Sequence, residues 1–104
     1  MVDAAFLGAM ADGALLVNAA RGVVVDTDAL VAELSSGRLR AAVDVTDPEP
    51  LPPGHPLWSA PGLLLTPHVA GEVPQTGERA AASVVDQVQR ILAGEPLVNV
   101  VDRY

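Results

Sequence analysis

The stretch Ala14–Gly22, with the sequence ALLVNAARG, decides how this chain is expected to fold. Its first residues form a short continuous apolar run, which is typical of a strand buried on both faces of a parallel sheet. Two further runs of this kind lie downstream, at Ala41–Val45 (AAVDV) and Leu63–Thr66 (LLLT). A turn or a proline follows each run, so we expect three strands.

The segments around these runs carry the apolar spacing of amphipathic helices. Helices are expected over residues 4–11, from Asp26 or Thr27 to about 36, and over about 74–93. Asp3 can cap the N-terminus of the first helix, and Gly94 ends the last one. A proline-rich loop covers residues 48–56, and residues 97–101 are expected to form a final extended segment.

Strands that alternate with helices indicate right-handed crossovers and a parallel sheet. We therefore predict an α/β fold with a partial Rossmann-like, doubly wound sheet. Three strands leave open edges with unpaired backbone groups, which a finished sheet avoids. The pattern is thus typical of part of a doubly wound domain.

Composition and charge exclude several classes of function. The chain has 104 residues, 6 basic and 13 acidic side chains and a net charge of −7, so it repels phosphate backbones and nucleic-acid binding is not expected. It has no cysteine, no basic signal-peptide start and no apolar run long enough for a membrane span. We expect a cytoplasmic protein that does not bind membranes.

An arginine, a glutamate and a histidine follow the predicted strands in order. They are Arg21, Glu49 and His68. Ligands and catalytic groups collect at the carboxyl ends of parallel strands, so we expect one site made from three loops. Arg21 could anchor a substrate carboxylate through two parallel hydrogen bonds, or it could be an ordinary loop arginine that pairs with one of many acids.

His68 and Glu49 suggest acid/base chemistry. An imidazole can protonate a carbonyl oxygen or remove a hydroxyl proton, and a neighbouring carboxylate fixes its tautomer. The alternatives are a strand-end histidine that bonds a backbone carbonyl and a solvated glutamate in a proline-rich loop. Spacing alone leaves both interpretations open.

Asp44 stands inside an otherwise apolar run, where a charged group is costly unless it is paired or functional. It could form a buried ion pair or contact the polar ring substituent of a cofactor. His55 is expected to be a turn residue, and Trp58 to pack the loop onto the domain. No grouping of His, Asp and Glu at helical spacing suggests a metal centre.

These runs, in this order, resemble the D-isomer-specific 2-hydroxyacid dehydrogenase family. The matching segments cover nearly the whole chain and are Gly13–Gly22, Ala42–Val45 leading to Pro48–Pro52, Leu64–Gly71 and Gly94–Val100. The resemblance implies that Arg21 binds the substrate carboxylate and oxo group, that His68 is the acid/base, and that Glu49 orients it. It also implies that Asp44 contacts the nicotinamide end of NAD or NADP, with Ala19, Ala20, Arg21 and His68 nearby.

The sequence departs from the family in lacking a glycine-rich G-x-G-x-x-G turn for the cofactor phosphates. The resemblance therefore implies that residues 1–94 are the second half of a Rossmann-type NAD-binding domain. Residues 95–104 would be an exit segment returning to the substrate domain.

We expect a fragment of an oxidoreductase acting on a small 2-hydroxy or 2-oxo acid, inactive alone. The alternative is a non-catalytic interaction or dimerisation module, a homo-oligomer or a chain that complements another one. A small hydrolase using Glu49 and His68 is a third interpretation, disfavoured because no serine has a nucleophile context.

Overall fold

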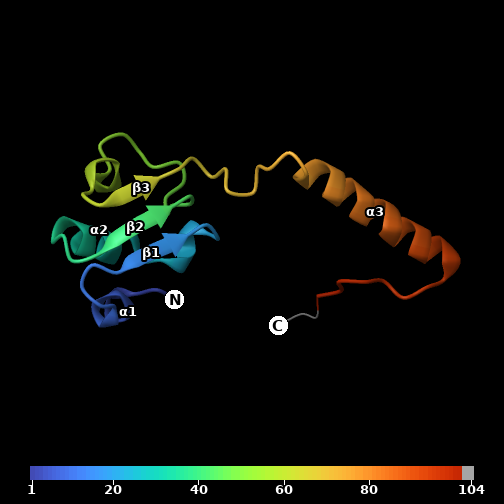
Figure 1. Cartoon of the computed structure of the whole chain (residues 1–104), viewed down its shortest axis with the longest axis horizontal. Coiled ribbons are helices and arrows are strands. Elements are labelled where there is room, and N and C mark those ends of the chain that lie inside the picture. The colour runs from blue at the N-terminus through green and yellow to red at the C-terminus, as the bar shows by residue number, and fades with distance from the viewer. Residues whose placement is uncertain (102–104) are drawn as a thin grey trace. The chain divides into compact units, whose positions relative to one another are not determined.

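The computed structural model describes residues 1–101, which form two compact units (Figure 1). The first unit is Met1–Ala70 and the second begins at Gly71. All the predicted site residues belong to the first unit. The predicted domain boundary after residue 94 stays a prediction, and the end of the predicted exit segment, residues 102–104, lies outside the described residues.

The first unit contains the three-stranded parallel sheet that the sequence predicts. Its strands are β1 (Leu15–Asn18), β2 (Arg40–Val43) and β3 (Leu63–Leu65), in the order β1-β2-β3. Leu16 is opposite Ala41, and Val43 is opposite Leu65. All three strands run the same way, so their carboxyl ends lie at one edge (Figure 1).

Two helices of this unit begin where their capping aspartates predict. Helix α1 (Ala4–Ala9) begins after Asp3, whose carboxylate accepts the Phe6 amide, and α2 (Thr27–Ser35) begins after Asp26. Short 3-10 turns follow at Gly22–Val24 and Pro56–Ser59. Helix α1 ends two residues before the predicted end, because the backbone becomes extended at Met10.

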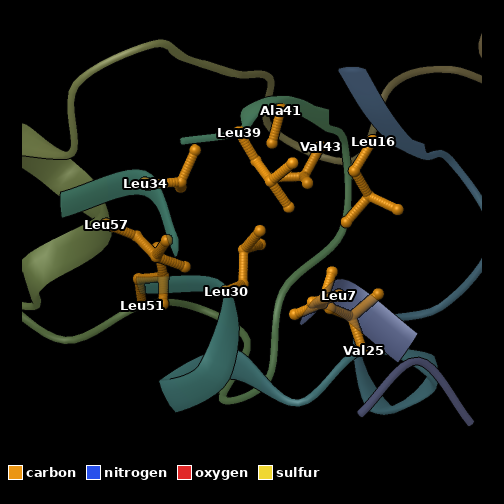
Figure 2. Close-up of a cluster of buried hydrophobic side chains, with 10 residues drawn as sticks. All are labelled: Leu7, Leu16, Val25, Leu30, Leu34, Leu39, Ala41, Val43, Leu51 and Leu57. Carbon is orange, nitrogen blue, oxygen red and sulfur yellow. The ribbon is translucent and has the colours of Figure 1, made fainter. Parts of the chain in front are cut away.

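The core lies on one face of the sheet. Leu16, Ala41 and Val43 pack with side chains from the helices and from the proline-rich loop (Figure 2). The helical contributors are Leu7 from α1 and Leu30 and Leu34 from α2, and the loop contributes Leu51 and Leu57.

The prediction that the strands are buried on both faces is wrong. Burial alternates along β1, where Leu15 is 51% and Val17 is 64% exposed, and Leu64 of β3 is 63% exposed. The reason is that the buried residues of α1 and α2 belong to the same cluster, on the other face. The apolar runs therefore predicted the strands correctly, but they did not predict how many faces of each strand are covered.

The second unit is built on helix α3 (Thr76–Ala93), which begins two residues later than predicted. Gly94 ends it in the left-handed conformation, with φ 68°. The predicted extended segment at 97–101 is wrong: the chain bends at Val98–Asn99, where Asn99 has φ 56° and the Gln87 side chain binds the backbone of Val98. Within residues 1–101 no helix combines the length and apolar character that a membrane crossing needs.

Candidate active site at the carboxyl ends of the strands

Glu49 and His68 lie in contact although 19 residues separate them in the sequence. The Glu49 Oε1 to His68 Nδ1 distance is 2.8 Å, and the side chains are 39% and 48% exposed. Glu49 comes from the loop after β2 and His68 from the loop after β3. The predicted partnership of these two residues is therefore present, at the carboxyl end of the sheet.

This contact determines which ring nitrogen is left for chemistry. An ionised carboxylate only accepts hydrogen bonds, so it selects the tautomer in which Nδ1 carries the proton and donates. Nε2 is then the nitrogen that can exchange a proton with a bound molecule. The arrangement can therefore perform acid/base catalysis on a hydroxyl or carbonyl group.

Asp44 holds the loop that carries His68. It directly follows β2 and is 6% exposed, and its carboxylate accepts hydrogen bonds from the Thr66 hydroxyl and from two backbone amides. These amides belong to Val69, at 3.0 Å, and Ala70, at 2.8 Å. The hydrogen bonds from Thr66 and then Ala70 lower the pKa of Asp44, against its burial.

The suggested buried ion pair at Asp44 is wrong, because its partners are a neutral hydroxyl and amides. Asp44 also follows the strand instead of lying within it. Its predicted contact with a cofactor remains a prediction.

Arg21 stands on a loop that a buried asparagine holds. The Asn18 side chain, 6% exposed, accepts the Ala20 amide at 3.1 Å and donates to the Arg21 carbonyl at 2.9 Å. The guanidinium is exposed and donates to the Ala20 carbonyl, and it forms no ion pair with any residue of the described chain. Within residues 1–101 the Arg21 side chain forms no hydrogen bond or ion pair with Glu49 or His68, so its guanidinium can bind an anionic ligand.

Our sequence reasoning did not select Asn18 as a site residue. A polar amide at the end of an apolar strand was the available signal, because a buried amide needs partners and the nearest ones are in the following loop.

The loops after β1 and β2 pack directly on each other at Gly22. A Cβ atom built on Gly22 would lie 1.9 Å from the Thr46 carbonyl oxygen. Only glycine allows the backbone that follows Arg21 to approach the segment that leads to Glu49 this closely.

Two hollows border the strand ends. One, of about 190 Å³, lies on the exposed sheet face and is lined by apolar Val17, Ala42 and Leu64 and by polar Asn18, Asp44 and Thr66, with Ala19, Val43 and Ala70. The other, of about 300 Å³, lies beside Glu49 and Thr46 and is lined mainly by apolar groups, including Leu51, Trp58 and Leu65. A planar ring that carries an amide suits the first hollow, since its apolar wall ends in polar groups.

The other singled-out residues have structural contacts. His55 Nδ1 accepts the Leu57 amide at the start of a 3-10 turn, as expected of a turn residue. Trp58 is 59% exposed and binds the Pro52 carbonyl, so it closes its own loop more than it packs on the domain. In the described part of the chain no three His, Asp or Glu side chains gather as metal ligands.

Known proteins are similar to this chain in sequence. Residues 1–70 match the family model of the D-isomer specific 2-hydroxyacid dehydrogenase, NAD binding domain. The chain is 40% identical over 104 residues to the glyoxylate/hydroxypyruvate reductase A of Escherichia fergusonii, which covers 99% of this chain and 33% of that protein. The chain thus spans about a third of the length of the curated relatives that it matches.

Solved structures agree. A D-isomer specific 2-hydroxyacid dehydrogenase from Xanthobacter autotrophicus Py2, in complex with NADPH and MES, is 45% identical with a TM-score of 0.84, over 95% of this chain and 40% of that one. The holo form of Rhodotorula graminis D-mandelate dehydrogenase is 35% identical with a TM-score of 0.87, over 98% and 30%. This chain therefore belongs to the D-isomer specific 2-hydroxyacid dehydrogenase family and carries part of its NAD-binding domain.

Proposed function

We propose that this chain supplies the acid/base pair and the nicotinamide-facing strand ends of an oxidoreductase. The enzyme would transfer a hydride between NAD(P)(H) and a small 2-hydroxy or 2-oxo acid. The observation that carries the proposal is the 2.8 Å contact between Glu49 and His68 at the carboxyl end of the sheet. An exposed pair of this kind adds little to stability, so its position in a ligand-binding region favours a chemical role.

Three side chains have distinct roles in this proposal. During reduction His68 starts as the imidazolium, gives its Nε2 proton to the substrate carbonyl oxygen and becomes the neutral ring with its proton on Nδ1; during oxidation the bare Nε2 takes the proton back from the hydroxyl group. Glu49 keeps the ring in the tautomer that presents Nε2. Arg21, which has no carboxylate partner of its own within residues 1–101, binds the substrate carboxylate.

The residues present fit the nicotinamide end of the cofactor. The 190 Å³ hollow offers an apolar wall for a ring and the Asp44 carboxylate for its amide, with Ala19, Ala20, Arg21 and His68 around it as proposed contacts. The bound cofactor supplies the hydride, and the chain orients the substrate and moves the proton. The sequence has no glycine-rich phosphate turn, so we propose that this chain has no measurable activity alone.

A chimera tests the proposed roles. This chain replaces the matching third of the Escherichia fergusonii reductase, and cofactor oxidation is followed with glyoxylate and hydroxypyruvate, the compounds in that protein's name. His68→Gln should lower kcat by about 10²–10⁴-fold, and Glu49→Gln should lower it less. Arg21→Lys should mainly raise KM, because an ammonium cannot bind a carboxylate through two parallel bonds. His55→Asn is the matched control, since asparagine can still cap the 3-10 turn.

Two results would contradict these assignments. Full activity of the His68→Gln chimera would remove His68 from the acid/base role. Reduction of glyoxylate by the purified 104-residue chain, above the rate of its His68→Gln variant, would show that the chain needs no other segment. The intact mass of the native product in its source cells is the companion measurement, because a species much heavier than 10.7 kDa ending in this sequence would be the complete enzyme.

A second candidate function rests on exposed apolar surface. Leu15, Val17 and Leu64 are exposed on one sheet face, and no residue of α3 is buried. Such surface favours a non-catalytic interaction module that forms a homo-oligomer or complements another chain. Sedimentation across a concentration series decides: association supports the module, and a strictly monomeric chain counts against it. With either function we place the chain in the cytoplasm.

A further inference from the structure

Asp44 is the one buried carboxylate of the described core, and it has an unusual set of partners. Its oxygens accept the Thr66 hydroxyl and the amides of Val69 and Ala70. The donors lie on either side of His68 in the sequence, 22, 25 and 26 residues from Asp44. A single side chain at the end of β2 thus accepts hydrogen bonds from both sides of the turn that follows β3.

The turn held in this way has a backbone that a histidine rarely adopts. His68 has φ 59°, in the left-handed region that non-glycine residues visit only when their surroundings impose it. Successive amides that follow such a turn point to one place and form a small anion-binding concavity. Here the anion is the protein's own Asp44 carboxylate.

The direction of the imidazole depends on this backbone. His68 does not bind Asp44 itself; its Nδ1 binds Glu49. The side chain is 48% exposed, so core packing does little to orient it. The left-handed backbone sets the direction of the Cα–Cβ bond of His68, and from that direction the ring reaches Glu49.

We propose that Asp44 is a positioning residue for His68, whose carboxylate holds the 66–70 turn in the form that directs the imidazole to Glu49. The inference rests on the proposed function in treating His68 as the acid/base. It adds a role that does not require the cofactor, because Oδ1 already accepts two hydrogen bonds and Oδ2 accepts one.

The test is NMR spectroscopy of the full chain with no cofactor, so its result does not depend on activity. The first measurement is amide hydrogen exchange at Val69 and Ala70. In Asp44→Asn, protection at both amides should fall by about tenfold or more, while core amides such as that of Leu34 keep theirs. Asp47→Asn is the matched control, because Asp47 is exposed and its substitution removes the same charge three residues along the chain.

The second measurement separates positioning from general support. In the native chain, Glu49→Gln should shift the imidazole signals of His68 strongly, because the two groups are in contact. In the Asp44→Asn background the same change should shift them much less. An undiminished response, with the fold intact, would overturn the proposal.

If the Asp44→Asn variant does not fold, the proposal is tested with Thr66→Val, which removes one hydrogen-bond donor and leaves the Asp44 carboxylate in place. The response of His68 to Glu49→Gln should then be reduced, and a full response would overturn the proposal. Loss of chimera activity on His68→Gln tests the proposed function separately. The two experiments can therefore overturn the positioning role of Asp44 without the acid/base role of His68, or the acid/base role without the positioning role.

Discussion

At the scale of single residues, the site combines exposed chemistry with buried supports. Asn18 and Asp44 are both 6% exposed and stand at the carboxyl ends of neighbouring strands. Asn18 binds the backbone that carries Arg21, and Asp44 binds the backbone around His68. A side chain that must meet a ligand cannot be fixed by burial. Its loop is therefore held from inside by a polar group with several partners.

The lowered pKa of Asp44 predicts how stability depends on pH. Its hydrogen bonds from Thr66 and Ala70 favour the charged form in the folded chain. The stabilisation is therefore complete above the unfolded pKa and is lost as pH falls through the lower folded value. Urea unfolding between about pH 6 and pH 3 should show this loss in the native chain and much less of it in Asp44→Asn. Parallel curves for the two chains would contradict the prediction.

The close packing at Gly22 predicts that adding one methyl group there lowers the stability of the fold. In Gly22→Ala the new Cβ would lie 1.9 Å from the Thr46 carbonyl oxygen, so a loop must move, at a cost of about 1–3 kcal/mol. Thermal unfolding should show a lower Tm than in the native chain. Gly8→Ala is the matched control, because it lies in α1 with nothing within 4 Å of the new atom, and its Tm should be unchanged or higher. Equal Tm values for the two variants would refute the close packing.

The sequence was enough to predict that Glu49 and His68 lie together at the proposed site, but not which residues support them. Glu49 and His68 could be paired because each follows a strand of one parallel sheet. The partners of Asp44 could not be foreseen, since the amides of Val69 and Ala70 are available only after His68 turns left-handed. A histidine carries no sequence signal for that conformation, whereas a glycine would.

At the scale of elements, a single arginine connects α1 to the turn before β2. At the end of α1, Arg38 donates to the carbonyl of Leu7 at 2.6 Å, which also accepts the Met10 amide, and to the carbonyl of Met10 at 2.7 Å. It also binds Glu33 in α2 at 2.7 Å, and this bond lowers the pKa of Glu33. The side chain thus holds both helices that cover the sheet.

Removal of Arg38 should therefore matter more than removal of its ion pair. We expect Arg38→Ala to lower Tm by about 5 °C or more, because the carbonyls of Leu7 and Met10 lose the hydrogen bonds from Arg38 and Glu33 loses its charge partner. Glu33→Gln keeps both carbonyl bonds and should lower Tm much less, since it removes only one partly buried ion pair. Thermal unfolding by circular dichroism measures both, and an equal loss would assign the effect to the ion pair.

The predicted helices and the three predicted strands were right in kind and differed at their ends. Asp3 and Asp26 cap the helices they were expected to cap, because capping is a local interaction of three residues. Strand ends depend on pairing with distant residues, so Asp44 was wrongly placed within β2. The apolar run at 97–101 was expected to extend, but its bend at Asn99 is supported by Gln87 of α3, a contact invisible in the run itself.

At the scale of the whole molecule, the sheet has one covered and one exposed face. The apolar sequence of β1 predicted cover on both faces, but Val17 remains exposed, as does Leu64 of β3. The apolar pattern of a strand indicates which of its faces are suited to be buried. Whether a face is buried depends on helices or loops elsewhere in the protein that pack on it. The chain spans about a third of the relatives it matches, so the matching segments of those proteins belong to a much longer chain.

In the proposed function this chain binds only the nicotinamide end of the cofactor and other protein binds the rest, which predicts an unusual binding pattern. The nicotinamide end has the 190 Å³ hollow beside Asp44. Phosphates usually bind at helix N-termini, but here Asp3 and Asp26 occupy those of α1 and α2 with their own carboxylates. The net charge of −7 adds repulsion.

Reduced nicotinamide mononucleotide and NADH should therefore bind this chain with similar weak affinities, within about threefold of each other. Titrations followed by NMR should shift the amides of Ala19 and Asp44, which line the hollow, by similar amounts with either ligand. ADP-ribose, which lacks the nicotinamide, should shift neither amide. NADH that binds more than about tenfold tighter than the mononucleotide would mean that this chain contacts the adenosine half as well, and the division of the cofactor proposed here would be wrong.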